Sequence, residues 1–213
     1  MLLIAHRTPS SQQECRSFAD AGAGAFEVDV QERQGQIVVS HFIPVPGTRG
    51  LLQHDNARLR PRGLETGDAT LGDVLGILPA DARILLDPKE VELSERRLLM
   101  SALIEQVTDR DRFRVSTHHE EDLRMLRAGG LRTWRTVKNR RQLREVLDAG
   151  ALPDEAVSVR ARLLDAEVVK RLHDVVESVI AWTVNDPRRA EDLRDFGVDG
   201  LTTDSREVMR AMR

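Results

Sequence analysis

The stretch Phe26-Glu27-Val28-Asp29-Val30 carries much of the information about the fold of this chain. Apolar and acidic residues alternate along it, and successive side chains of a β-strand point to opposite faces. Glu27 and Asp29 therefore emerge on the same side of one strand. Two carboxylates that face one way are costly in an ordinary core, whereas they suit a bound cation. The stretch predicts a strand that carries acidic side chains into a polar site.

Two further apolar segments end in side chains that can handle a phosphate or a proton. They are Ile4-Ala5-His6-Arg7 and Val38-Val39-Ser40-His41. Histidine changes its charge near neutral pH, so His6 and His41 could serve as acid and base in one reaction.

The order of predicted elements favours a barrel. Within residues 94–108, apolar residues recur at three- and four-residue steps, as an amphipathic helix requires. Strands separated by helices pair in parallel through crossovers. Seven such strands, together with a hairpin of 25–30 and 36–41, are enough to close a TIM (β/α)8 barrel, and an open doubly wound sheet is the alternative. We expect strands at 2–6, 25–30, 36–41, 83–87, 112–117, 131–137, 156–160, 178–184 and 199–203, and helices at 10–21, 71–78, 94–108, 120–128, 139–149, 165–176, 187–196 and 205–212.

No domain boundary interrupts this pattern, so residues 1–213 are predicted to form a single domain. The one irregular stretch is 43–70, which is rich in Pro, Gly and Arg. Loops that follow barrel strands build the active-site face, so we expect this stretch to overhang the site. The absence of a Gly-x-Gly-x-x-Gly or Gly-Lys-Ser/Thr motif argues against a nucleotide-binding open sheet.

The composition excludes several classes of function. A net charge of −3 and an aromatic share of 3% without Tyr argue against a nucleic-acid partner. The single cysteine, Cys15, excludes an internal disulfide and is interpreted as a helix-packing residue. With no signal-like or membrane-spanning apolar run, we expect a cytoplasmic protein without a stable membrane anchor.

Further polar residues fall where a barrel places its functional groups, at the carboxyl ends of strands. Glu27, Asp29 and Asp87 offer only oxygen ligands, which favours Mg²⁺ or Ca²⁺. Arg7 and Lys89 add fixed positive charge suited to a phosphoryl group.

Six segments follow one another in the order seen in a known family. They are Ile4-Ala5-His6-Arg7, Glu27-Val28-Asp29-Val30, Val39-Ser40-His41, Asp87-Pro88-Lys89, Ala181-Trp182-Thr183-Val184-Asn185 and Gly197-Val198-Asp199-Gly200-Leu201-Thr202-Thr203-Asp204. In this order the chain resembles the glycerophosphodiester phosphodiesterase family from residue 3 to about residue 205.

The resemblance implies a TIM barrel of the phospholipase C-like phosphodiesterase type, without a large inserted subdomain. It implies an enzyme of lipid metabolism that uses one divalent cation, Mg²⁺ or Ca²⁺, to hydrolyse a small glycerophosphodiester to an alcohol and glycerol phosphate. The implied roles are Glu27, Asp29 and Asp87 as metal ligands, His6 and His41 as the acid–base pair, Arg7 and Lys89 as phosphate ligands, and Trp182 as a wall of the substrate pocket.

The chain departs from the family pattern at several positions. Thr8 replaces the usual Gly after His-Arg, Asp87 replaces a Glu, and Phe42 replaces the Asp that usually follows the second histidine. Asp87, the loss of the His-Asp pair at Phe42 and the short insertion between His41 and Asp87 also resemble the sphingomyelinase D-like branch. The alternative is therefore a lyase that expels an alcohol and leaves a cyclic phosphate. A barrel that only binds phosphodiesters is a third hypothesis, and the retained pair His6 and His41 argues against it.

Other residues near strand ends receive simpler interpretations. Asn185 is predicted to be a turn residue before Pro187, and Trp182 could also be core packing. His118 and His119 end a strand, belong to no motif, and could face the mouth of the barrel. The leaving alcohol and the oligomeric state are left open by the sequence.

Overall fold

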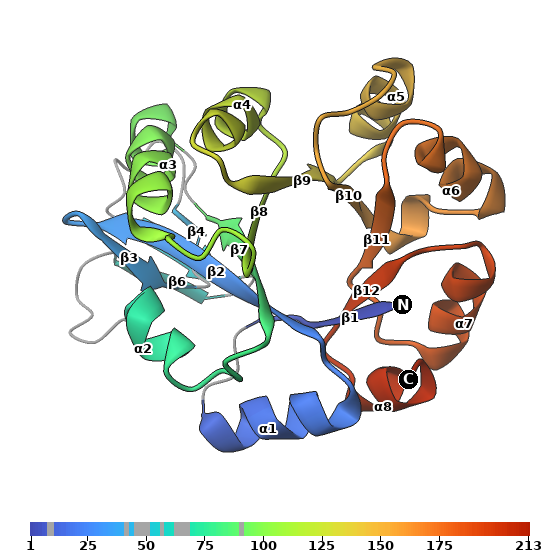
Figure 1. The fold of residues 1–213 in the computed structure, drawn as a ribbon, viewed down its shortest axis with the longest axis horizontal. Coiled ribbons are helices and arrows are strands. Elements are labelled where there is room, and N and C mark those ends of the chain that lie inside the picture. The colour runs from blue at the N-terminus through green and yellow to red at the C-terminus, as the bar shows by residue number, and fades with distance from the viewer. Residues whose placement is uncertain (8–10, 41–42, 45–51, 56–57, 62–68, 90–91) are drawn as a thin grey trace.

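The computed structural model describes residues 1–7, 11–40, 43–44, 52–55, 58–61, 69–89 and 92–213. Eight parallel strands among these residues form a closed barrel, because β1 pairs with both β12 and β2 (Figure 1). This confirms the predicted TIM barrel. The strands are β1 (Leu2–Ala5), β2 (Ala25–Arg33), β7 (Arg83–Pro88), β8 (Phe113–Thr117), β9 (Arg132–Val137), β10 (Ala156–Arg160), β11 (Ser178–Trp182) and β12 (Gly200–Thr203).

Helices surround the barrel on its outer side (Figure 1). Several begin at a polar residue whose side chain accepts a hydrogen bond from the first turn, as Ser11, Asn139, Asp165 and Ser205 do. The helices are α1 (Gln12–Ala21), α2 (Leu71–Leu75), α3 (Leu93–Gln106), α4 (Glu120–Ala128), α5 (Arg140–Asp148), α6 (Ala166–His173), α7 (Pro187–Asp195) and α8 (Arg206–Ala211), with a 3₁₀ turn, η1 (Ala161–Leu163). Among the helices so described, none is long and apolar enough to cross a bilayer.

Only one strand of the predicted hairpin belongs to the closed barrel. β2 is itself a barrel strand, whereas β3 (Gln36–Val39) pairs with it antiparallel and ends the sheet. The expectation that 43–70 is wholly irregular is wrong. Three short strands, β4 (Ile43–Pro44), β5 (Leu52–Asp55) and β6 (Arg58–Pro61), form an antiparallel sheet there. Neighbouring short segments can pair locally without the long apolar runs on which the prediction relied.

The barrel interior changes character along its strands. Its apolar part contains Ile4, Ala25, Leu85, Trp134, Ala156 and Ile180. Further along the same faces, Glu27 and Asp29 follow Ala25 on β2, and Asp87 follows Leu85 on β7. The carboxyl end of the barrel is thus acidic while its centre is apolar.

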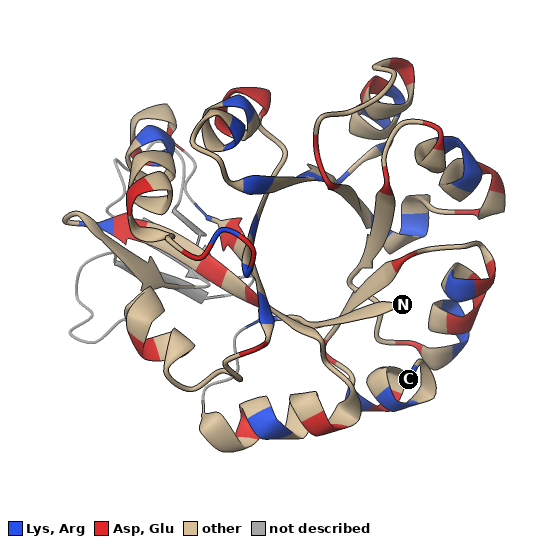
Figure 2. Cartoon of the chain, in the orientation of Figure 1, with Lys and Arg blue, Asp and Glu red and all other residues tan. Residues whose placement is uncertain are grey.

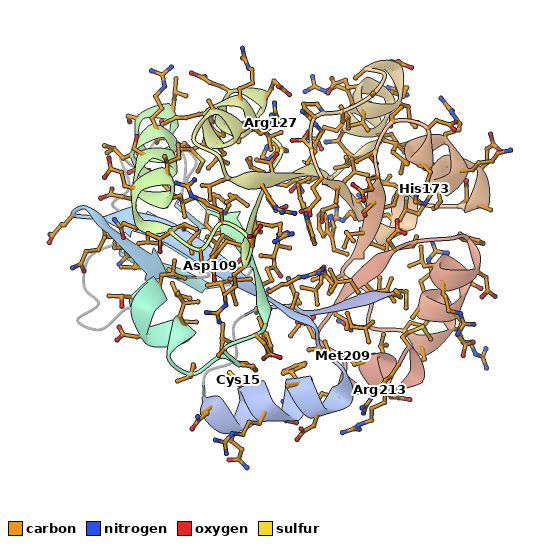
Figure 3. All side chains as sticks on the ribbon, in the orientation of Figure 1. Cys15, Asp109, Arg127, His173, Met209 and Arg213 are labelled. Carbon is orange, nitrogen blue, oxygen red and sulfur yellow. The ribbon has the colours of Figure 1, made fainter. Side chains whose placement is uncertain are left out.

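A second, larger apolar layer lies between the strands and the helices. Cys15 belongs to this layer on α1 and is fully buried (Figure 3). Its burial agrees with the predicted packing role.

Candidate active site

The acidic cluster lies at the carboxyl ends of β2 and β7. Carboxylate oxygens of Glu27, Asp29 and Asp87 all lie within 4.8 Å of one another. The parallel register causes this, because Asp29 is the direct partner of Asp87. Glu27 and Asp29 are only 7% and 3% exposed. Three oxygen donors gathered in this way could hold a hard cation.

The cluster is electrostatically strained. Burial raises the pKa of Glu27 to about 8, with His6 opposing this shift and the charges of Asp87 and Asp29 adding to it. Lys89 relieves part of the repulsion: its Nζ lies 2.8 Å from Asp29 Oδ1 and also donates to Asp87 Oδ2. Burial alone would lower the pKa of Lys89, but the neighbouring carboxylates raise it, so Lys89 is a permanent positive charge. Figure 2 shows acidic and basic positions together at this part of the rim.

His6 is held between two carboxylates. Its Nδ1 lies 2.8 Å from Asp204 Oδ1 and its Nε2 lies 3.4 Å from Glu27 Oε2. Burial by itself lowers the pKa of His6, but the hydrogen bond to Asp204 and the charge of Glu27 outweigh it, so the pKa is raised. With Nδ1 bound to Asp204, Nε2 is the ring atom that faces the acidic cluster.

Asn185 fixes the position of Asp204. Its Nδ2 donates to Asp204 Oδ2 at 2.9 Å, and its Oδ1 accepts from the Asp204 backbone N–H at 2.9 Å and from Thr203 Oγ1 at 3.0 Å. Asn185 lies in the connection after β11, where a turn was predicted, and these hydrogen bonds with Asp204 and Thr203 were not foreseen. The sequence analysis assigned no role to Asp204. Both residues follow the ends of neighbouring strands, β11 and β12, and that placement was the available signal.

Arg7 and Trp182 lie at other points of the rim. Arg7 is exposed, follows β1 with a positive φ of 63°, and its charge helps to lower the pKa of Asp204, after the hydrogen bonds from His6 and Asn185. Trp182 is half-buried, and its Nε1 donates to the Ser158 carbonyl oxygen at 2.9 Å. The Arg160 guanidinium lies 5.7 Å from the Trp182 ring centroid. These contacts tie Trp182, at the end of β11, to the end of the neighbouring strand β10.

His41 and Phe42 lie outside the described residues. The preceding residue, Ser40, donates its backbone N–H to the Asp29 carbonyl oxygen at 3.0 Å. Ser40 therefore lies beside the backbone of Asp29.

His118 and His119 lie at the mouth of the barrel, one of the positions that the sequence left open for them. They line a pocket of about 260 Å³ that also contains Asp87 and Lys89, and their ring centroids are 3.9 Å apart. Burial, then the charges of neighbouring cations, lowers the pKa of His118 to about 3. His118 is therefore neutral near pH 7.

A comparison with protein-family models decides the class of the molecule. The model of the glycerophosphoryl diester phosphodiesterase family matches residues 69–208. The chain belongs to this family. Membership confirms the resemblance based on the six ordered segments, and it confirms the predicted enzyme class, a phosphodiesterase. A search of curated proteins finds no match.

Solved structures of this family share the fold. A phosphodiesterase from Oleispira antarctica, in complex with the product sn-glycerol-3-phosphate, is 17% identical with a TM-score of 0.74, and the alignment covers 100% of this chain and 96% of that one. The glycerophosphodiester phosphodiesterase of Thermotoga maritima is 19% identical with a TM-score of 0.71, covering 100% and 99%. The barrel is thus retained nearly end to end at low sequence identity.

Proposed function

We propose that this phosphodiesterase hydrolyses a glycerophosphodiester to glycerol phosphate and an alcohol with the help of one divalent cation. The observation that carries the proposal is the meeting of Glu27, Asp29 and Asp87 within 4.8 Å, beside a histidine that another carboxylate orients. The Oleispira antarctica structure, which holds sn-glycerol-3-phosphate, supports glycerol phosphate as the product.

The three carboxylates fit a divalent cation on chemical grounds. Their donors are all oxygen, as Mg²⁺ and Ca²⁺ prefer. The raised pKa of Glu27 reflects burial among like charges, and a cation would remove this cost. When bound, the cation supplies positive charge that stabilises the negative charge developing on the phosphate oxygens.

The phosphate is bound by the basic residues of the rim. Lys89 already lies in the cluster, and we assign Arg7 and Lys89 to the phosphate oxygens. Trp182 forms the apolar wall against which the organic part of the substrate packs. These contacts hold the phosphorus atom beside His6.

His6 and His41 move the protons. Water attacks phosphorus, one histidine takes its proton, the bond between phosphorus and the leaving oxygen breaks, and the other histidine protonates the leaving alkoxide. In His6, Nδ1 is bound to Asp204, so Nε2 is the atom assigned to this transfer. We assign the partner role to His41, the residue that follows Ser40 in the sequence.

The test is turnover of glycerophosphodiesters of choline, ethanolamine, glycerol and inositol with Mg²⁺ or Ca²⁺, with products identified by phosphorus NMR. We expect glycerol phosphate and free alcohol, and no turnover in EDTA. His6→Ala and His41→Ala should each lose about 10²–10⁴ in rate. Full turnover in EDTA would contradict the cation requirement, and a cyclic phosphate as end product would identify a lyase.

Cation binding has a second readout that does not depend on activity. Mg²⁺ or Ca²⁺ should raise the melting temperature of the wild-type protein, because a ligand that binds only the folded state stabilises it. Asp29→Asn should abolish this rise, whereas Asp192→Asn, an exposed acid on α7, should retain it. An equal rise in both variants would place the cation elsewhere.

A further inference from the structure

The pocket of about 260 Å³ beside the acidic cluster, hereafter the side pocket, extends the mouth toward β8 and β9. It shares Asp87 and Lys89 with the cluster, and its outer wall is formed by His118, His119 and Lys138. In the strand order of the closed barrel, β11 lies directly across from β7 (Figure 1). A diester centred on the cluster therefore has Trp182 on one side and the side pocket on the other.

The charges of the side pocket leave one cation unbalanced. Arg96 is paired with Asp122, with Nε 3.0 Å from Oδ2 of a nearly buried carboxylate. Lys89 is paired with acids of the cluster. Lys138, which follows β9, makes no ion pair among the residues that the structure describes. Positive charge without a carboxylate partner at a pocket wall favours an anionic ligand.

The surroundings of Lys138 point the same way. The Lys138 side chain is exposed overall, but the partial loss of water around its ammonium lowers the pKa of that group. The charge of Asp87 opposes this shift, and repulsion from Lys89 adds to it. An anion in the side pocket would stabilise the charged form of Lys138. His118 is neutral, so its imidazole adds a hydrogen-bond donor without further charge.

We propose that the side pocket binds a second phosphate group, carried by the alcohol half of the diester. This rests on the proposed function, because the scissile phosphate must occupy the acidic cluster for its alcohol to reach Lys138. The Lys138 ammonium contacts the second phosphate, with donors from the β8–α4 connection on its other side. The preferred substrate class is then a glycerophosphodiester whose alcohol is itself phosphorylated, rather than one with a neutral or cationic alcohol.

The test compares glycerophosphoglycerol with bis(glycerophospho)glycerol, which carries the second phosphate on the same alcohol. The wild-type protein should show the higher kcat/KM for the doubly charged substrate. Lys138→Gln should reduce that preference about tenfold or more, since a hydrogen bond between charged groups is typically worth at least this factor. Lys138→Arg should retain it, as should Lys170→Gln, a matched exposed lysine on α6. Equal losses on both substrates, or an unchanged preference in Lys138→Gln, would overturn the proposal.

If the proposed function is wrong, the wild-type protein will hydrolyse neither diester, and this outcome differs from those above. The side pocket would then be judged by binding of inorganic phosphate to the cation-free protein, measured by calorimetry. Binding weakened about tenfold by Lys138→Gln, and not by Lys170→Gln, supports an anion site there. Binding that is insensitive to Lys138→Gln refutes it.

Discussion

Replacing Asp204 by Asn tests whether this carboxylate positions His6. The substitution keeps the shape of the side chain and removes its charge from a 2.8 Å hydrogen bond to Nδ1. A hydrogen bond to a charged group is worth about 1.5–3 kcal/mol, against about 0.5–1.5 kcal/mol for a neutral one. Asp204 is 47% exposed, so solvent screening places the loss near the low end, at about 1 kcal/mol. That corresponds to roughly a fivefold fall in kcat/KM if the bond orients His6 for proton transfer.

The assay is hydrolysis of a glycerophosphodiester at saturating divalent cation, with thermal melts to verify folding. Asn185→Ala should lower kcat/KM less than Asp204→Asn, because it loosens Asp204 but keeps its charge. Asp192→Asn is the control for removing an exposed acid and should behave as wild type. If Asp204→Asn keeps kcat/KM within twofold of wild type while His6→Ala is inactive, Asp204 does not position His6.

Two further predictions concern stability. Burial raises the pKa of Glu155, but hydrogen bonds from Arg114 and Trp134 outweigh burial, so the pKa is lowered in the folded state. The ionised Glu155 therefore stabilises the fold above its unfolded-state pKa of about 4.3, and this stabilisation is lost as the pH falls through the lower pKa of the folded state. Glu155→Gln should therefore cost about 1–3 kcal/mol at pH 7 and progressively less toward pH 3 in urea unfolding, and a pH-independent cost would contradict the argument. Gly200→Ala should destabilise the barrel by about 1–3 kcal/mol, because its Cβ would meet Ile180 Cδ1 at 2.8 Å, and unchanged urea unfolding would show that the interior adjusts freely.

The sequence by itself determined the features that depend on local periodicity. Alternation along 26–30 places Glu27 and Asp29 on one face of a strand, whatever that strand pairs with. Strands separated by helical segments require parallel pairing, and this led to the barrel that the structure contains. Once the strands are parallel, their carboxyl ends meet at one rim, so the placement of Asp87 at the same rim as Asp29 also followed from the sequence, whereas their direct pairing did not.

Only the tertiary structure decided the partners that the barrel closure brings together. His6 and Asp204 are 198 positions apart in the chain and meet because β1 pairs with β12. The pairing of Asn185 with Asp204 depends on how the chain turns after β11, which no local pattern encodes. The unbalanced charge of Lys138 likewise became visible only when the partners of the neighbouring cations were known. Such contacts depend on side-chain directions at a shared rim, and sequence periodicity specifies the face of a strand but not the neighbours across it.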